Sequence, residues 1–94
     1  MSDLETFLLL HDGYPISKSF FDRVQQQLEE RLPTLKRYKR YKAQPLLGDA
    51  FWDAMNNGER RMAGRCLAHI VARKLVPLHF AKSNHEYPKW YQLN

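Results

Sequence analysis

The chain has 94 residues, of which 44% are hydrophobic and 27% are charged. This length and composition predict one domain with a modest core and exclude a disordered polyelectrolyte. Fifteen Lys and Arg against ten Asp and Glu give a formal net charge of +5, and the single cysteine excludes an intramolecular disulfide.

The first 33 residues predict two helices separated by a turn. Ser2 and Asp3 can cap a short helix through about Leu10, and the turn-forming residues 11–15 end it. Ser17 is the candidate N-cap of the second helix. After it, apolar residues follow at spacings of three, four and four: Phe21, Val24, Leu28 and Leu32. This spacing predicts one buried helix face, which Pro33 closes.

Residues 34–45 form a basic connection for which two structures stay open. A short helix capped by Thr34 and an extended segment both fit the sequence, although Pro45 disfavours helix at the residue before it. The connection holds five candidate phosphate contacts: Lys36, Arg37, Lys39, Arg40 and Lys42. Tyr38 and Tyr41 stand between them, and tyrosines stack on bases or hydrogen-bond the backbone. A solvated face or a site for an acidic protein is the alternative.

Residues 46–75 predict a pair of helices with the outline of a helix-turn-helix. The first helix is expected over residues 46–55, the turn over the Asn-Asn-Gly of residues 56–58, and the second helix over residues 59–75. The apolar face of the second helix consists of Met62, Ala63, Cys66, Leu67, Ile70 and Val71. Arg60, Arg61 and Arg65 share the other side with small residues, as expected of a helix that lies in a DNA groove. Alternatively, the small residues pack against another helix and the arginines are merely solvated.

Residues 76–94 predict a β-hairpin. Apolar and polar residues alternate in two short runs, so that Leu78-His79-Phe80 can pair with Tyr91-Gln92-Leu93. Residues 83–86 are the expected turn, and Lys82 and Lys89 stand near it as candidate nucleic-acid contacts.

A helix-turn-helix followed by a hairpin, over roughly residues 46–93, resembles the winged helix-turn-helix superfamily of DNA-binding domains. The expected fold is therefore mostly α with a C-terminal β-hairpin, in one domain: N-terminal helices (1–33), basic connection (34–45), helix-turn-helix (46–75) and hairpin wing (76–94). The resemblance implies that Arg60, Arg61 and Arg65 enter the major groove and that the wing, with Lys82, touches the backbone or minor groove. Two features depart from the superfamily's plan: the connection is longer and more basic than usual, and no first strand is evident.

Charge is distributed unevenly along the chain. Residues 1–30 hold six acidic and two basic residues, whereas residues 31–94 hold thirteen basic and four acidic ones. Clustered positive charge predicts an anionic partner, and duplex DNA is the leading candidate. We therefore expect a small DNA-binding transcription regulator or accessory factor. The alternative is a protein-interaction module or inhibitor that docks its basic, aromatic surface on an acidic protein of the nucleic-acid machinery. A homodimer would suit an operator binder, but no dimer stripe is visible.

Neither catalysis nor membrane binding is indicated. No phosphate-binding glycine loop and no metal-ligand spacing of histidines is present, and the one cysteine has no cysteine partner. We expect no catalytic residue, no cofactor and no metal. The apolar run of residues 7–10 is too short for a signal peptide, and no stretch approaches the about 18 apolar residues of a membrane span. A soluble, cytoplasmic protein is expected.

Overall fold

A computed structural model describes residues 6–81 and 89–94 of the chain. In chain order its elements are β1 (Phe7–Leu9), β2 (Pro15–Ser17), α1 (Lys18–Arg31), the 3-10 helix η1 (Leu32–Thr34), α2 (Ala43–Leu47), α3 (Asp49–Asp53), α4 (Asn57–Ala72), β3 (Leu78–Phe80) and β4 (Tyr91–Leu93). Four α-helices and two small antiparallel hairpins thus make a mixed α/β fold in the described residues. The expected combination of helices with a C-terminal hairpin is compatible with it.

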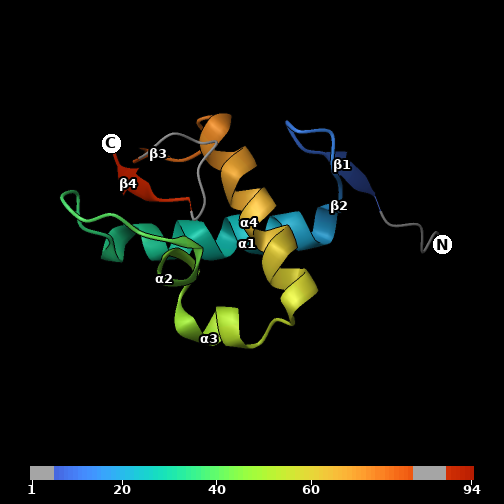
Figure 1. Cartoon of the computed structure of the whole chain (residues 1–94), viewed down its shortest axis with the longest axis horizontal. Coiled ribbons are helices and arrows are strands. Elements are labelled where there is room, and N and C mark those ends of the chain that lie inside the picture. The colour runs from blue at the N-terminus through green and yellow to red at the C-terminus, as the bar shows by residue number, and fades with distance from the viewer. Residues whose placement is uncertain (1–5, 82–88) are drawn as a thin grey trace.

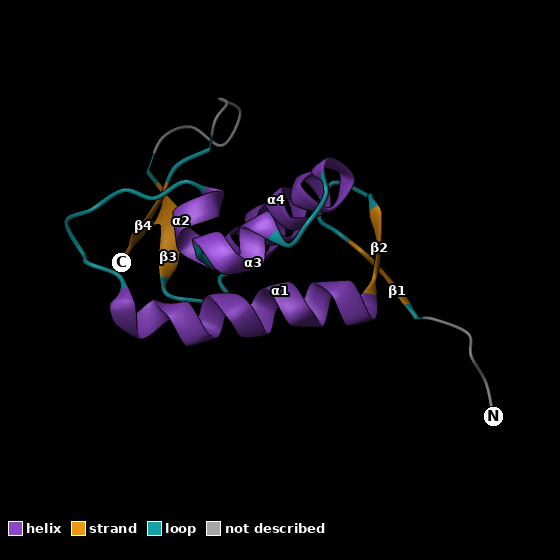
Figure 2. Cartoon of the chain, turned by 90° about the horizontal axis from the view of Figure 1, so that it is seen from below, coloured by secondary structure: helices purple, strands orange, loops and turns teal. Residues whose placement is uncertain are grey.

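The two long helices form the frame of the molecule. α4 crosses α1, with the β1–β2 hairpin at one end of the long axis and the loop after η1 at the other (Figure 1). In Figure 2, α1 runs along the bottom of the view, and α2, α3 and α4 lie above it. The core lies between these helices, and Val24, Leu28, Leu67 and Ile70 are fully buried in it. No helix of the described residues is long and apolar enough to span a membrane.

The helix expected near the N-terminus is a β-hairpin instead. β1 pairs antiparallel with β2 in the register Phe7↔Ser17, Leu8↔Ile16 and Leu9↔Pro15. Exposure alternates along β1, which leaves Phe7 and Leu9 exposed while Leu8 packs against the core. A run of four apolar residues is compatible with either period, so the sequence pattern did not separate strand from helix. The expected turn at residues 11–15 is present and closes this hairpin, with Gly13 at φ +82°. The expected cap residues Ser2 and Asp3 lie outside the described residues.

The predicted start of α1 and its buried face up to Leu28 are confirmed, whereas Leu32 is half-buried and the 3-10 turn that contains Pro33 continues to Thr34. Ser17 Oγ accepts a hydrogen bond of 3.3 Å from the backbone N–H of Phe20, as an N-cap does. The helix buries Phe20, Phe21, Val24 and Leu28, and it passes into η1 at Leu32.

The expected single helix over residues 46–55 is two short helices. α2 begins earlier than expected, at Ala43, and includes Pro45, which is tolerated because the first turn of a helix has N–H groups without intrahelical partners. α2 ends at Gly48, whose φ of +89° is incompatible with helix continuation, and α3 begins directly after it.

α4 occupies the expected place with shifted ends. Asn56 is its N-cap in a capping box with Glu59, so Asn57 and Gly58 belong to the helix instead of forming a separate turn. At the other end Lys74 has φ +58°, and Leu75 N–H donates to the carbonyl of Ile70, which ends the helix three residues before the predicted boundary.

The C-terminal hairpin has the predicted pairing: Leu78↔Leu93, His79↔Gln92 and Phe80↔Tyr91. Its expected turn at residues 83–86 lies outside the described residues. On the other side of β4, Tyr41 forms an isolated antiparallel bridge with Tyr91. The segment before α2 therefore adds one residue to this sheet, at a place where the sequence showed no strand.

Candidate nucleic-acid interface

The basic loop, residues 36–42, is an ordered structure of turns and backbone hydrogen bonds. Of the two structures that the sequence left open, the helix is wrong, since η1 ends at Thr34 and the next helix, α2, begins only at Ala43. Tyr41 and Tyr91 exchange backbone hydrogen bonds of 2.7 and 2.8 Å. The Tyr41 hydroxyl accepts a hydrogen bond of 2.9 Å from the N–H of Lys36, and Gln92 Nε2 donates one of 2.8 Å to the carbonyl of Arg37. The loop is thus tied to the C-terminal hairpin at two residues, Tyr41 and Arg37, by three hydrogen bonds, and the Tyr41 hydroxyl braces it internally.

The loop presents its positive charge to solvent. Its five cations, Lys36, Arg37, Lys39, Arg40 and Lys42, are all exposed. None of them forms an ion pair with a carboxylate of the described residues. Lys39 Nζ lies 5.4 Å from the ring centroid of Tyr41, and Lys42 Nζ lies 4.9 Å from that of Trp90. The two tyrosines differ, since Tyr41 is buried whereas Tyr38 is 80% exposed.

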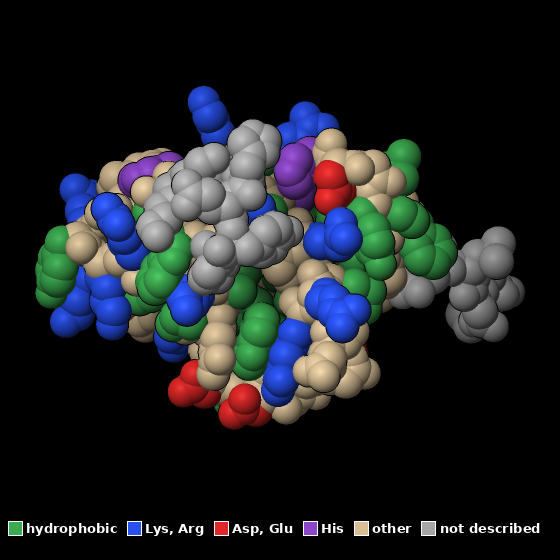
Figure 3. Space-filling model, viewed as in Figure 1, with side chains coloured by type: hydrophobic (Ala, Val, Ile, Leu, Met, Phe, Trp, Pro, Cys, Tyr) green, Lys and Arg blue, Asp and Glu red, His purple; other side chains and the backbone are tan. Residues whose placement is uncertain are grey.

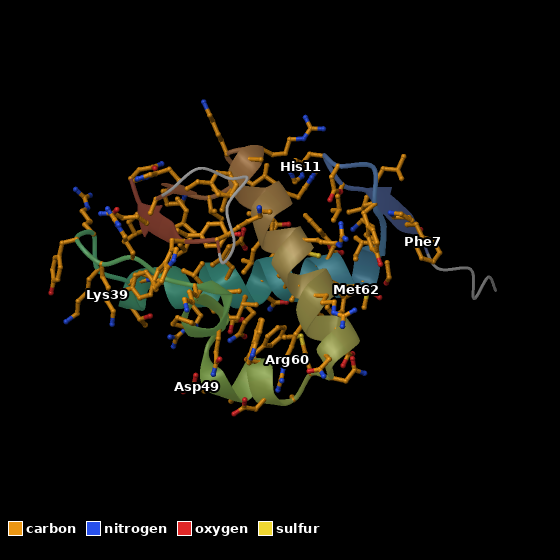
Figure 4. All side chains as sticks on the ribbon, viewed as in Figure 1. Phe7, His11, Lys39, Asp49, Arg60 and Met62 are labelled. Atoms are coloured by element: carbon orange, nitrogen blue, oxygen red, sulfur yellow. The ribbon has the colours of Figure 1, made fainter. Side chains whose placement is uncertain are left out.

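Arg60, the first of the three predicted arginines of α4, turns towards α3. Its Nε donates a hydrogen bond of 3.1 Å to the carbonyl of Trp52, and Nη2 lies 3.8 Å from Oδ1 of Asp53. Its guanidinium carbon lies 5.7 Å from the ring centroid of Trp52. Figure 4 shows Arg60 beside α3. The donors of Arg60 are directed at neighbouring groups of the protein.

Arg65 is held by the turn of the β1–β2 hairpin. Its Nη1 donates to Oδ2 of Asp12 at 3.0 Å, and its guanidinium carbon lies 4.2 Å from the ring centroid of Tyr14. A hydrogen bond from the backbone N–H of Tyr14, and to a lesser extent the charge of Arg65, lower the pKa of Asp12 below its ordinary value. Desolvation acts in the opposite direction, and its effect is smaller than that of the hydrogen bond. The Arg65 side chain stays 46% exposed, so its guanidinium is positioned and remains accessible.

Arg61, which lies between these two in the sequence, is exposed. It forms no ion pair within the described residues. With Tyr14, Met62 and Arg65 it lines a hollow of about 380 Å³ at the start of α4. The small residues expected on this outward side do not all lie on the surface, because Ala68 is buried.

The two charge clusters of the sequence predict that the basic loop and the α4 arginines share one exposed surface, and this prediction is met only in part. Lys and Arg side chains gather at the loop end of the face shown in Figure 3, and others lie over α4. Asp and Glu show on this face at the lower edge, over α3, and beside a histidine near the β1–β2 turn. Positive charge therefore predominates on the face, while two of the three predicted α4 arginines have a carboxylate beside them.

Of the two lysines predicted as nucleic-acid contacts near the hairpin tip, Lys82 and Lys89, the structure describes only Lys89. Lys82 lies outside the described residues. Lys89 is half-buried and directly precedes Trp90, whose ring lies 4.9 Å from Nζ of Lys42.

The titratable side chains of the described residues include one buried thiol, Cys66, and one pair of neighbouring histidines, His11 and His69. Burial raises the pKa of the Cys66 thiol to about 12. His69 lies 5.5 Å from His11 between ring centroids, and its Nδ1 accepts a hydrogen bond of 2.8 Å from the N–H of His11. No group of three or more His, Cys, Asp or Glu side chains in the described residues is placed to hold a metal ion.

Sequence reasoning missed Asp12, Tyr14 and Arg31 as neighbours of the predicted site. Asp12 and Tyr14 reach α4 only because β1 and β2 fold back on it, and Arg31 lines a hollow beside the basic loop. No pattern in the sequence joins these residues to their partners.

Comparisons of the chain with protein-family models, with curated proteins and with solved structures give no match.

Proposed function

We propose that this protein binds nucleic acid, with duplex DNA as the preferred form, through the basic loop and the exposed arginines of α4. The observation that carries the proposal is the exposed position of five loop cations that have no carboxylate partner in the described residues. Such cations neutralise phosphates and release the counterions condensed on them, which is the main source of affinity in nonspecific DNA binding.

The order of the loop supports the proposal. Tyr41 is paired on both backbone groups with Tyr91, and its hydroxyl and the side chain of Gln92 hold two further points of the loop. A segment that is already ordered loses less conformational entropy on binding than a flexible one. The backbone that carries the five cations is therefore already held in place, at little additional entropic cost on binding.

The order of elements supports a winged-helix-like module as the form of this binding domain. A helix (α1), a bridged residue, short helices (α2 and α3), a long helix (α4) and a hairpin follow one another. A single bridged residue, Tyr41, between α1 and α2 supports this proposal, because the superfamily's plan has a first strand in that part of the chain. A DNA-binding regulator or accessory factor is the role that we propose for such a module.

The α4 arginines have unequal roles in this proposal. Arg61 is exposed and is the best placed of the three to contact DNA. Arg65 adds a guanidinium that Asp12 and Tyr14 orient. The donors of a guanidinium form a rigid fork, which favours bidentate contacts with phosphates or base edges. Arg60 serves mainly to join α4 to α3, since its contacts are with Trp52 and Asp53.

Salt-dependent binding tests the proposal, with a matched control for net charge. Affinity for a random-sequence duplex is measured by fluorescence anisotropy for the wild type, for the loop variant Arg37→Gln/Lys39→Gln/Arg40→Gln and for the control variant Lys18→Gln/Arg23→Gln/Arg73→Gln. If the loop neutralises about five phosphates, wild-type affinity should fall roughly 500-fold between about 50 and 200 mM salt. The loop variant should lower the slope of log K against log salt by about 3, since each phosphate contact contributes about 0.9.

The control variant removes the same number of charges from α1 and the end of α4, and it should keep most of the wild-type slope. Equal losses in both variants would mean that net charge alone attracts DNA and that the loop is not the site. Absence of binding to any duplex, together with one stoichiometric acidic protein partner, would favour the protein-interaction alternative instead.

A further inference from the structure

A hollow beside the basic loop has the chemical character of a nucleotide site. It has a volume of about 500 Å³, within the range of small-ligand sites. It lies between the end of α1, η1, the basic loop and the start of α2. Its polar lining consists of Arg31, Thr34, Lys36, Tyr38, Lys39 and Tyr41. Three of these six are cations, and no Asp or Glu lines the hollow.

Arg31 lines the hollow from the last residue of α1. Its Nη2 donates a hydrogen bond of 3.1 Å to the carbonyl of Pro45, and its side chain lies against Gly48. Nε is buried and makes no hydrogen bond within the described residues. Because this Nε is buried beside Gly48, which does not line the hollow, Arg31 contributes the positive charge of its guanidinium to the hollow and not this particular donor.

Lys36 and Lys39 approach the same hollow from the turn of the basic loop. The N–H of Lys39 donates to the carbonyl of Lys36 at 3.2 Å, which closes the turn and brings the two lysines to its base. Arg37 and Tyr38 occupy its tip. Phosphate oxygens in the hollow would therefore meet positive charge from the loop and from the end of α1.

Tyr38 supplies an aromatic surface at the rim. It lines the hollow and is 80% exposed, whereas Tyr41 is buried and forms part of the wall. An exposed ring beside clustered cations is the combination by which proteins hold unpaired bases, since each of the bases can stack on an aromatic ring.

We propose that this hollow binds one nucleotide unit, with its phosphate against Arg31, Lys36 and Lys39 and its base stacked on Tyr38. This rests on the proposed function and extends it, because a base inside a duplex cannot stack on Tyr38. The unit is therefore the unpaired end of a bound strand or a free nucleotide. The chemistry is the same for both, namely a phosphate joined to a base.

The test compares a duplex that ends in a short single-stranded overhang with the same duplex cut blunt. Affinities of the full chain are measured by anisotropy for the wild type, Tyr38→Ala and Tyr38→Phe. Loss of base stacking should lower affinity for the overhang at least about fivefold in Tyr38→Ala. Tyr38→Phe keeps a ring and should keep the affinity, and blunt-duplex affinity should stay within about twofold in both variants. Because Tyr38 is exposed, neither substitution endangers the fold.

A second arm identifies the source of the nucleotide. Thymidine monophosphate, thymidine and inorganic phosphate are titrated into the wild type, and amide shifts are followed at residues 31–41. Shifts that need both base and phosphate support the site. If they occur without preference for the overhang, the occupant is a free nucleotide.

Two outcomes overturn the inference, and they are distinguishable. Equal affinity for overhang and blunt duplex, unchanged by Tyr38→Ala and with no response to the monophosphate, rejects the nucleotide site while duplex binding stands. If neither DNA nor the monophosphate binds, the proposed function and the nucleotide site fail together.

Discussion

Tyr41 and Tyr91 lie opposite each other and exchange two backbone hydrogen bonds, one in each direction. Tyr41 belongs to the basic loop and Tyr91 begins β4, and both side chains are buried. The most positively charged segment of the chain is therefore held by the hydrophobic core. Any change that loosens this pair should affect the fold and the displayed charge together.

The hydroxyl of Tyr41 should contribute measurably to stability. Tyr41→Phe removes the acceptor for the Lys36 N–H and should lower the free energy of unfolding by about 1 kcal/mol. Tyr38→Phe is the matched control, because Tyr38 is exposed, and it should change stability by less than about 0.5 kcal/mol. Urea unfolding followed by tryptophan fluorescence measures both. Equal effects of the two substitutions would show that the hydroxyl bond does not hold the loop.

Two glycines should respond to alanine with opposite signs. Gly48 has φ +89° and ψ 147°, a region almost confined to glycine, so Gly48→Ala should destabilise by about 1–3 kcal/mol. Gly64 lies inside α4 with open space around it, so Gly64→Ala should stabilise by about 0.5–1 kcal/mol. Thermal unfolding of the two variants gives the signs directly. Stabilisation by Gly48→Ala would contradict the break between α2 and α3.

His69 should make stability depend on pH. Its Nδ1 accepts a hydrogen bond from the N–H of His11, so this nitrogen holds no proton in the folded state. Burial, followed by electrostatic effects of the neighbouring His11 and Arg73, lowers the pKa of His69 from its ordinary value of 6.5. The unfolded chain then takes up a proton more readily than the folded one. The stabilising effect of neutral His69 is therefore complete above about pH 6.5 and falls as the pH is lowered through that value.

Unfolding at about pH 7.5 and pH 5.5 measures this effect when the wild type is compared with His69→Asn, which keeps an acceptor but does not titrate in this range. The wild type should lose more stability on acidification than the variant does. Asp12 does not disturb the comparison, because its lowered pKa places its loss of stabilisation below its ordinary value of 3.8. Identical losses in the two proteins would show that the His11–His69 contact is not coupled to folding.

Cys66 should be unreactive in the folded protein. It is fully buried, and its pKa is raised to about 12, so at neutral pH almost none of it is thiolate. A thiol reagent should label it slowly in native conditions and rapidly in denaturant. Fast native labelling would contradict the packing of α4 against the core.

The sequence predicted best those elements whose signals are local and periodic. The capping serine and the spacing of Phe21, Val24 and Leu28 located α1, and alternation in residues 78–80 and 91–93 located the C-terminal pairing. The N-terminal hairpin was missed because its apolar run is too short for its period to be read. The break at Gly48 depends on a positive φ, which the residue type permits but does not announce.

The candidate site was predictable as a set of charges but not as a set of contacts. The basic loop stands out in the sequence, and its five cations are exposed as a solvated or binding surface requires. The partners of Arg60 and Arg65 were not foreseen, because Asp12 is brought to Arg65 by folding and Asp53 lies on a different helix from Arg60. Long-range pairs of this kind follow from tertiary packing, which no local pattern contains.

The most direct measurement of the central claim is an NMR titration of the isotope-labelled protein with random-sequence duplex DNA. If the basic loop and the exposed side of α4 form the binding surface, the largest amide shifts will occur in residues 36–42 and around Arg61 and Arg65. They will diminish as salt is added. Shifts confined to the outer side of α1, or no shift at DNA concentrations that saturate ordinary nonspecific binders, would contradict the account.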